Sequence, residues 1–328
     1  MPAEARTVAG LGEAGLLELV LPRLRVGEAL LGPGDDAALV AAPDGRFVIT
    51  ADTLVEDQDF RLRWPSGYES TGFDVGWKSA AQNLSDVNAM GAEASAAVVS
   101  LTLPPRTPVD WVLGFADGFA AACVGLGATR CSVAGGDLGT GREISVTTTV
   151  TGDLAGRRPV LRSGARPGDV LVVTGSPGRA AAGLSLLESA VPAAGWNDDE
   201  AGLAASQLRP APPLALGPAA AVAGATAMMD LSDGIARDAP RLARASGVDL
   251  VLDADVLGDL GAGLRGLAAR HGRDVLDWVV GGGEDFGLLA CFPPGAVADG
   301  FTVIGRAAEG RGTVRGIPGA HRGWDHFE

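Results

Sequence analysis

Six short acidic turns divide this chain, and most of them lie where an apolar segment ends. They are Gly34-Asp35-Asp36, Thr50-Ala51-Asp52-Thr53, Asn83-Leu84-Ser85-Asp86, Gly135-Gly136-Asp137, Asp230-Leu231-Ser232-Asp233-Gly234 and Gly282-Gly283-Glu284-Asp285. Glycine, aspartate and serine favour turns, so these positions limit where strands and helices begin and end. Carboxylate oxygens are also the ligands that Mg²⁺ prefers, together with water and substrate phosphates. Several such turns meeting in space would make a multi-metal site for polyphosphate chemistry.

The size and composition of the chain fit a globular protein of two domains. It has 328 residues, and only 5% of them are aromatic, so its core is expected to consist mostly of Ala, Val and Leu. The formal net charge is −14 without a basic block, which disfavours nucleic-acid binding. An acidic enzyme can still bind a nucleotide when magnesium mediates the contact.

The cysteines and apolar segments predict a cytoplasmic protein that does not associate with membranes. Cys123, Cys131 and Cys291 are odd in number and lack a CxxC spacing, which favours reduced, buried thiols. The first residues show no secretory signal, and no apolar run approaches the ~18–20 residues of a membrane span.

Hydrophobic periodicity predicts an irregular mixture of helices and strands. A long helix is expected over 73–90, ended by Gly91, with strands over 37–42, 47–50, 170–173 and 227–231. The stretch 157–169 is rich in Arg, Gly and Pro and breaks the pattern. We therefore place a domain boundary near residue 150, giving domains 1–150 and 151–328. The mixture favours α+β or mixed α/β architecture over a regular parallel sheet.

Several familiar catalytic sites are absent from the sequence. The three histidines do not suit a Ser-His triad, and no His/Cys cluster has zinc-ligand spacing. The P-loop and the His-Arg-Asp loop of protein kinases are missing. The glycine-rich segment 172–178 resembles a phosphate-binding turn, but an ordinary strand-to-helix turn is the favoured interpretation.

Taken singly, each acidic turn has a structural explanation. Asp35 or Asp36 suits an Asx turn, and Asp233 suits the N-cap of a helix that begins near Ile235. Asp86, however, lies toward the end of the predicted helix, where the helix dipole disfavours negative charge. Its position suggests a compensating cation. The six turns together therefore favour a metal site more than any one of them does.

The order of these motifs resembles the thiamine-monophosphate kinase family, which belongs to the aminoimidazole ribonucleotide synthetase superfamily. The similarity extends over nearly the whole chain. It rests on Gly32–Ala38, Asp52–Glu56, Asn83–Asp86, Met90–Ala92, Gly135–Asp137, Leu161–Asp169, Asp230–Gly234, Gly282–Phe286 and Gly323–Phe327. The resemblance implies a two-domain fold of the aminoimidazole ribonucleotide synthetase type. Its N-terminal α/β domain would dimerise through a mixed sheet covered by helices, and its C-terminal domain would be α+β. It also implies ATP-dependent phosphorylation of thiamine monophosphate to thiamine diphosphate, with several Mg²⁺ ions and ATP as co-substrate.

The resemblance also implies roles for individual residues. Asp86, Asp137 and Arg162 would be catalytic, and Gly136, Asp137, Arg162 and Ser232 would contact ATP. Asp59, Glu284 and Trp324 would contact the thiamine substrate. The implied metal ligands are Asp36, Thr50, Ala51, Asp52, Asp86, Asp137, Asp230 and Asp233. These roles make physical sense, since phosphoryl transfer between two anions needs positioning and charge neutralisation. Arg162 could bind a phosphate through two hydrogen bonds, Glu284 could counter a thiazolium charge, and Trp324 could stack on a ring.

The sequence departs from the family pattern near the substrate end. Asp59 stands where the family has a histidine, and Ala51 replaces a common threonine, leaving only its backbone carbonyl as a ligand. The segment between Phe60 and Phe73 is several residues longer than in many relatives. Two alternatives therefore stay open: another ATP-dependent synthetase of the same superfamily, or a nucleotide- or metal-binding homologue without turnover.

Overall fold

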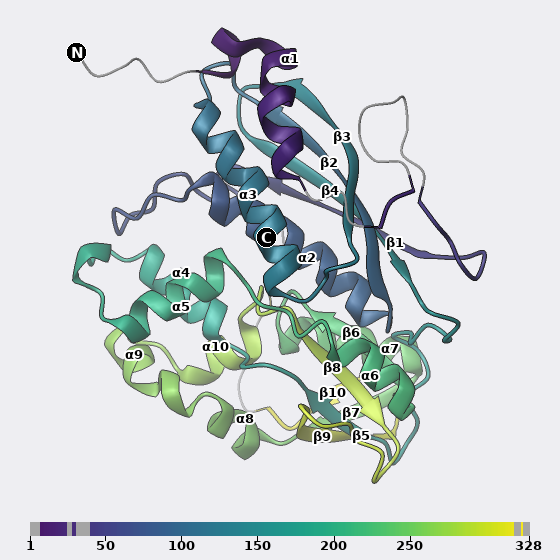
Figure 1. Cartoon of the computed structure of the whole chain (residues 1–328). Helices are drawn as coiled ribbons and strands as arrows, with labels where there is room; N and C mark the ends of the chain where they lie inside the picture. Colours follow the sequence, from purple (N-terminus) through teal and green to yellow (C-terminus); the bar gives the residue numbers. More distant parts are fainter. Residues whose placement is uncertain (1–6, 25–27, 31–39, 318–322, 324–328) are drawn as a thin grey trace.

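The first half of the chain forms a four-stranded sheet covered by helices on one face. The computed structural model describes residues 7–24, 28–30, 40–317 and 323. The strand order is β1-β4-β2-β3, with β3 parallel to β2 and the other neighbours antiparallel. Helix α2 packs on the sheet, α3 packs on α2, and α1 packs on α3 (Figure 1). The elements are α1 (Val8–Val20), the 3₁₀ turn η1 (Leu21–Arg23), β1 (Val48–Val55), α2 (Gly72–Ala89), β2 (Glu93–Leu103), α3 (Val109–Gly125), β3 (Ser132–Thr140) and β4 (Ser145–Asp153).

Helix α2 is defined by signals at both of its ends. The Thr71 hydroxyl accepts a hydrogen bond from the Asp74 backbone N–H at 3.2 Å, and the Asp74 carboxylate accepts one from the Thr71 N–H at 2.9 Å. This reciprocal pair is a capping box. Past the other end, Gly91 has a φ of +73°, which a side chain would disfavour. The predicted helix over 73–90 is therefore confirmed.

Glycines bring the backbones of α2 and α3 into contact. A Cβ atom added at Gly72 would lie 1.8 Å from the carbonyl oxygen of Trp111, and one at Gly76 would lie 2.1 Å from that of Phe115. A Cβ at Gly118 would meet the Phe73 carbonyl at 2.1 Å. Because backbone atoms cannot give way as flexible side chains do, the α2–α3 packing depends on the absence of side chains here.

The second half contains a six-stranded sheet of order β10-β7-β9-β5-β8-β6. Only β10 and β7 are parallel neighbours. Its strands are β5 (Val170–Val173), β6 (Ala227–Leu231), β7 (Val248–Leu252), β8 (Gly287–Phe292), β9 (Thr302–Glu309) and β10 (Val314–Arg315). Its helices are α4 (Arg179–Leu187), α5 (Asp198–Leu208), α6 (Leu216–Ala223), α7 (Ile235–Ser246), α8 (Ala254–Leu260), α9 (Arg265–Arg270) and α10 (Val275–Gly281), with 3₁₀ turns η2 (Ala193–Gly195) and η3 (Ala262–Leu264).

The predicted strands over 170–173 and 227–231 are confirmed as β5 and β6. The strand expected over 47–50 begins at Val48 and continues to Val55. The strand expected over 37–42 is wrong for residues 40–42, which are not in a strand, while 37–39 lie outside the described residues. Strand β4 runs through residue 150 to Asp153, and residues 154–169 connect the two sheets.

A segment of the first half, residues 56–71, lies against α4 and α5 of the second half (Figure 1). The Ser66 N–H donates to the Leu187 carbonyl at 3.1 Å, and the Ala193 N–H donates to the Ser66 carbonyl at 2.9 Å. The rings of Tyr68 and Trp196 stack with centroids 6.4 Å apart. The longer segment noted in the sequence therefore connects the two halves.

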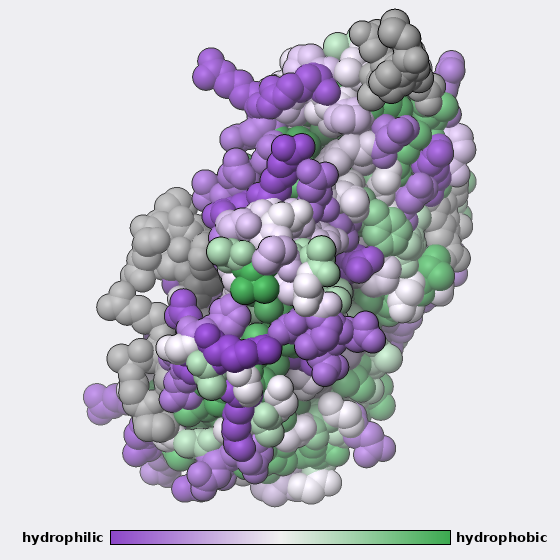
Figure 2. All heavy atoms as spheres, turned by 90° about the vertical axis from the view of Figure 1, so that its left-hand side faces the viewer, coloured by the Kyte–Doolittle hydropathy of each residue, from purple (hydrophilic) through white to green (hydrophobic). Residues whose placement is uncertain are grey.

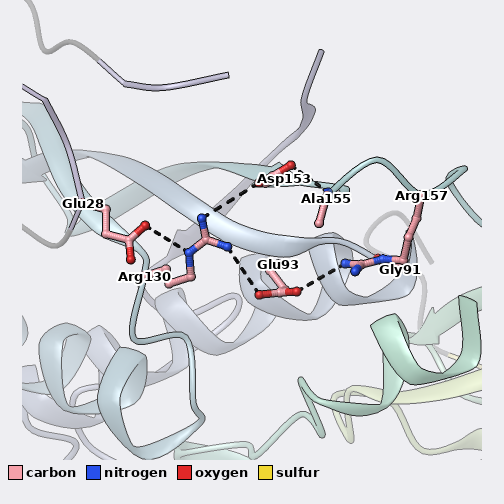
Figure 3. Close-up of polar contacts among 7 residues, drawn as sticks. All are labelled: Glu28, Gly91, Glu93, Arg130, Asp153, Ala155 and Arg157. Carbon is pink, nitrogen blue, oxygen red and sulfur yellow. Dashed lines mark hydrogen bonds and ion pairs between the residues drawn. The ribbon is translucent and has the colours of Figure 1, made fainter. Parts of the chain in front are cut away.

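A network of ion pairs joins loops at one end of the first sheet (Figure 3). Arg130 lies 3.0 Å from Glu28 and 3.6 Å from Glu93, and Arg157 lies 3.3 Å from the other oxygen of Glu93. Asp153 is 4.0 Å from Arg130. Exposed pairs of this kind stabilise a protein only slightly, so we expect the network to contribute little to the stability of the fold.

No helix in the described parts of the chain is both long enough and apolar enough to cross a membrane. On the face of the molecule that carries α4 and α5, hydrophilic residues predominate, with smaller hydrophobic areas between them (Figure 2).

Candidate active site

The acidic site begins where strand β1 faces the second half of helix α2. The Thr50 hydroxyl donates a hydrogen bond to the Asp86 carboxylate at 2.5 Å. The Asp52 backbone N–H donates to the side-chain oxygen of Asn83 at 3.2 Å. Thr50 and Asp52 are two residues apart on a strand, so their side chains project toward the same face, which α2 covers.

The second half of the chain adds a third carboxylate, Asp230, on strand β6. Burial, followed by the negative charge of Asp86, raises the pKa of Asp230 well above its ordinary value. Burial and the charge of Asp86 also raise the pKa of Asp52 to about 7. Burial raises the pKa of Asp86, although the hydrogen bond from Thr50 opposes this shift. The structure thus holds the three carboxyl groups together, and their negative charges repel one another.

Two cavities meet at these carboxylates. The larger has a volume of about 880 Å³, and the smaller has a volume of about 500 Å³. Asp86 and Asp230 line both cavities. Asp52, Ser232, Asp233 and Glu284 line the larger one, whereas Thr50 and Arg162 line the smaller one. Two bound molecules could therefore approach each other across this acidic junction.

The carboxylates of Asp52, Asp86 and Asp230 suit a hard divalent cation that takes only some of its ligands from the protein. A cation would relieve the repulsion that raises the pKa values of Asp52 and Asp230. Among the described residues, however, no group of three or more His, Cys, Asp or Glu side chains has the geometry to hold a metal ion alone. Mg²⁺ commonly takes one or two carboxylates and completes its shell with water and substrate phosphates. The arrangement fits that mode.

Arg162 lines the smaller cavity, whereas Glu284 lines the larger one. The positive charge of Arg162 opposes the increase in the pKa of both Asp86 and Asp230. Its side chain lines the smaller cavity together with Met228, Met229 and Leu161. This cavity therefore combines an apolar wall with a cation that suits a phosphate.

Asp233 is already paired with cations. Its carboxylate lies 2.6 Å from Arg241 and 3.6 Å from Arg237. Ser232 is next to it, and its carbonyl accepts a hydrogen bond from the Glu284 N–H at 2.7 Å. A direct metal contact by Asp233 would compete with these arginines.

The structure separates Asp137, Gly136 and Ala51 from the carboxylate junction. Strand β3 lies at the opposite edge of the sheet from β1, about 14 Å away at about 4.8 Å per strand. Across the sheet, the residue of β1 that is in register with Asp137 is Thr53, through Ser100 and Thr147. Asp52, the neighbour of Thr53 on β1, is in register with Gly136 instead, through Thr148 and Val99. Aligned residues share a face, so Asp137 projects from the face away from α2. Ala51 alternates with Thr50 and Asp52 and lies on that outer face too.

The residues predicted to contact the thiamine substrate are described only in part. Glu284 and Asp59 both line the larger cavity. One oxygen of Asp59 also accepts a hydrogen bond from the Val55 N–H at 2.8 Å, within its own loop. Trp324 lies outside the described residues, and so does the predicted metal ligand Asp36.

The end of the glycine-rich segment 172–178 binds a side chain of the protein itself, that of Asp285. The backbone N–H groups of Gly178 and Ala180 donate to the two oxygens of Asp285 at 2.6 and 2.9 Å. A carboxylate therefore already occupies the N-terminus of α4, and the interpretation as an ordinary strand-to-helix turn is supported.

Two residues that touch the site, Lys78 and Gln207, are not among those predicted from the sequence. Lys78 lies on α2, with its ammonium 2.6 Å from a Glu284 oxygen, and Gln207 of α5 donates to the other oxygen. Neither residue belongs to a recognisable motif. The one available signal is a lysine within the otherwise uncharged segment 75–85 of a predicted helix.

Comparison with known proteins identifies the family. Residues 34–154 match the model of the AIR synthase related protein N-terminal domain, and residues 166–312 match that of the C-terminal domain. The thiamine-monophosphate kinase of Mycobacterium tuberculosis is 42% identical over 332 aligned positions, which cover 100% of this chain and 95% of the relative. The chain belongs to the thiamine-monophosphate kinase family.

Solved structures agree with this membership and confirm the predicted fold. AaThiL complexed with AMPPCP and TMP is 29% identical to this kinase-family chain and matches it with a TM-score of 0.75, covering 99% of this chain and 100% of that one. The thiamine-monophosphate kinase from Stenotrophomonas maltophilia is 32% identical and matches with a TM-score of 0.74. This match covers 93% of the present chain and 95% of that one.

Proposed function

We propose that this protein transfers the γ-phosphoryl group of ATP to the phosphate of thiamine monophosphate. A phosphate oxygen of thiamine monophosphate forms the new bond to phosphorus, and the bond to the β-phosphate oxygen breaks, so the products are thiamine diphosphate and ADP. The observation that carries the proposal is the pair of cavities that share Asp86 and Asp230. Membership in the thiamine-monophosphate kinase family, in which a relative has been solved with AMPPCP and TMP, supports it.

Each cavity suits one reactant. In the smaller cavity, Arg162 would bind ATP phosphates while the methionines and Leu161 contact the base. In the larger cavity, Glu284 and Asp59 would face the thiamine part, whose thiazolium ring carries a positive charge. Ser232 lines the larger cavity, two residues after Asp230 in the sequence, and would contact ATP phosphates that extend past Asp230.

The residues at the junction would act by positioning and by charge. Mg²⁺, when bound, supplies the neutralisation that lets two phosphate groups approach each other. Asp52, Asp86 and Asp230 would hold the ions, and Thr50 fixes the orientation of Asp86 through its hydrogen bond. Arg162 would add positive charge from the side of the nucleotide. Phosphoryl transfer needs no covalent intermediate on the protein, and none of these roles requires one.

We further propose a homodimer formed through the open face of the first sheet. Two large apolar side chains on this sheet are exposed, Ile49 at 63% and Val98 at 43%. Asp137 projects from the same face, so it could join a site built by Asp52 only if a second subunit supplied it. Cys123, Cys131 and Cys291 are buried, as is usual for thiols in a reducing compartment, and we infer a cytoplasmic location.

The direct test is incubation of the folded protein with ATP, thiamine monophosphate and Mg²⁺, with products separated by chromatography. We expect thiamine diphosphate and ADP in equal amounts, and neither product when EDTA removes the metal. ADP that forms without thiamine diphosphate would favour another synthetase of the superfamily. Binding of AMPPCP without any turnover would favour a homologue that has lost catalysis.

A further inference from the structure

The carboxylate of Glu284 is held at the wall of the larger cavity by two buried side chains. The Lys78 ammonium lies 2.6 Å from one oxygen, and the Gln207 amide donates a hydrogen bond to the other. Lys78 and Gln207 are each only 3% exposed, whereas the Glu284 side chain is 30% exposed. Glu284 thus faces the cavity while its two partners lie behind it.

Lys78 is placed to act on Glu284 and not on a bound molecule. Its ammonium also donates to the Asp59 carbonyl at 2.9 Å, so two of its three N–H bonds are used inside the protein. Lys78 is not among the described residues that line the larger cavity, whereas Gln207 and Glu284 are. The lysine therefore connects α2 to two loops that form the cavity wall.

The backbone around Glu284 has an unfavourable conformation that contacts such as those from Lys78 and Gln207 can stabilise. Glu284 has a φ of +65° and Phe286 a φ of +50°, in the region that residues other than glycine rarely adopt. Conformations of this kind cost energy and persist only where surrounding contacts hold them. A glutamate also has three side-chain torsions, so an unpaired Glu284 would rotate toward water at the mouth of the cavity.

We propose that Lys78 and Gln207 are positioning residues that fix the Glu284 carboxylate and so determine how tightly thiamine monophosphate binds. The inference rests on the proposed function, because it takes Glu284 as the group that faces the thiazolium. Each carboxylate oxygen accepts one bond from these partners and keeps a lone pair for the cavity. The negative charge thereby stays at one place, and the cationic ring is bound in one orientation.

The test measures steady-state kinetics of Lys78→Met with both substrates varied. We expect the KM for thiamine monophosphate to rise about tenfold, equivalent to about 1.4 kcal/mol, which is near the value of one hydrogen bond to a charged group. The KM for ATP and kcat should change less than about threefold, because Lys78, Gln207 and Glu284 do not line the smaller cavity that would hold the nucleotide. Gln207→Leu should raise the same KM and serves as the second variant if Lys78→Met does not fold.

Two controls separate positioning from stability. Arg209→Met breaks a contact between the residue that follows α5 and helix α2, the pair of Arg209 with Asp74 at 3.5 Å, and should leave the KM for thiamine monophosphate unchanged. In a Glu284→Gln background, Lys78→Met should have little further effect on this KM, because residues that act through one another are not additive. A fall in kcat and thermal stability at constant KM would reduce Lys78 to a structural role and overturn the proposal. If the unmodified protein forms no thiamine diphosphate, the proposed function itself is wrong and the inference falls with it.

Discussion

At the scale of the residue, the acidic site places like charges together in a buried position. Burial raises the pKa values of Asp52, Asp86 and Asp230, so their ionised forms are unfavourable in the folded protein without a cation. Functional sites often contain groups with such perturbed pKa values. Removing one of these charges should therefore impair function without weakening the fold.

The variant Asp86→Asn tests whether removal of one charge impairs function without weakening the fold. The variant keeps the acceptor oxygen for Thr50 but loses the charge at the junction of the two cavities, so we expect kcat to fall about 100-fold or more. Its free energy of unfolding without metal should stay the same or increase, as measured by chemical denaturation. Asp299→Asn, in an exposed loop, is the matched control. Normal turnover in Asp86→Asn would show that this carboxylate does not act in the reaction.

Single residues also show where prediction from sequence stops. Asp52, Asp86 and Asp230 are predicted because each belongs to an acidic motif with turn-forming neighbours. The expected turns are wrong for Asp52 and Asp86, which lie inside β1 and α2. Lys78 and Gln207 carry no such signal, since only the packing of α2, α5 and the turn before β8 brings them to Glu284. Asp137 shares its motif type with the others, yet the register of β3 places it on the outer face of the sheet.

At the scale of the element, the α2–α3 pair depends on close backbone contact. Gly76→Ala would place a methyl group 2.1 Å from the Phe115 carbonyl, which cannot move without separating the helices. We expect the free energy of unfolding to fall by about 1–3 kcal/mol. Gly202→Ala is the matched control, because α5 offers space there, with the nearest atom 4.0 Å away. That change should stabilise the protein by about 0.5–1 kcal/mol, and equal effects in both variants would contradict the packing argument.

The Asp285 carboxyl at the N-terminus of α4 should make the stability of the protein depend on pH. Burial raises the pKa of Asp285 to about 7 from an ordinary value of 3.8, although the hydrogen bonds from Ala180 and Gly178 oppose the shift. Below pH 3.8 the group is protonated in both states. Between about pH 4 and pH 7 only the unfolded chain ionises, so this group makes the folded protein less stable as the pH rises.

Asp285→Asn removes this contribution because the amide does not titrate. The free energy of unfolding of the variant minus that of the unmodified protein should therefore increase from pH 4 to pH 7. A difference of one pKa unit between the folded and unfolded states corresponds to about 1.4 kcal/mol. Denaturation with urea across this range measures it. The carboxyls of Asp52 and Asp238 also have raised pKa values, so both proteins will lose stability with pH, and parallel curves would contradict the role of Asp285.

Elements with strong local signals were predictable, and short ones were not. Strands β5, β6 and β7 are continuous apolar or alternating runs between turn residues, and α2 has signals at both of its ends. Helices α8 and α10 have only seven residues each, too short to show a helical period. Strand β9 has only two buried residues, and they are three positions apart, so it lacks the alternation of apolar and polar residues that indicates a strand.

At the scale of the whole molecule, the site forms only because the two halves of the chain meet. Asp86 comes from α2 and Asp230 from β6, and residues 56–71 bind the first half to α4 and α5. The order of motifs made the family resemblance specific, but the sheet orders follow from pairings between distant strands, which local patterns do not contain. The separation of Asp137 from Asp52 is a consequence of that order.

The open face of the first sheet should form the homodimer interface, and a charge placed on this face should prevent association. Val98 is exposed on β2, on the face opposite α2, and it lines neither of the large cavities within the described residues. A charge at the centre of a homodimer interface would be buried without a partner, so Val98→Glu should shift the protein from dimer to monomer. Light scattering coupled to gel filtration measures the mass. Val222→Glu on α6, where Val222 is 76% exposed, is the control and should leave the mass unchanged. A monomeric unmodified protein, or a dimer that tolerates Val98→Glu, would contradict association through this face.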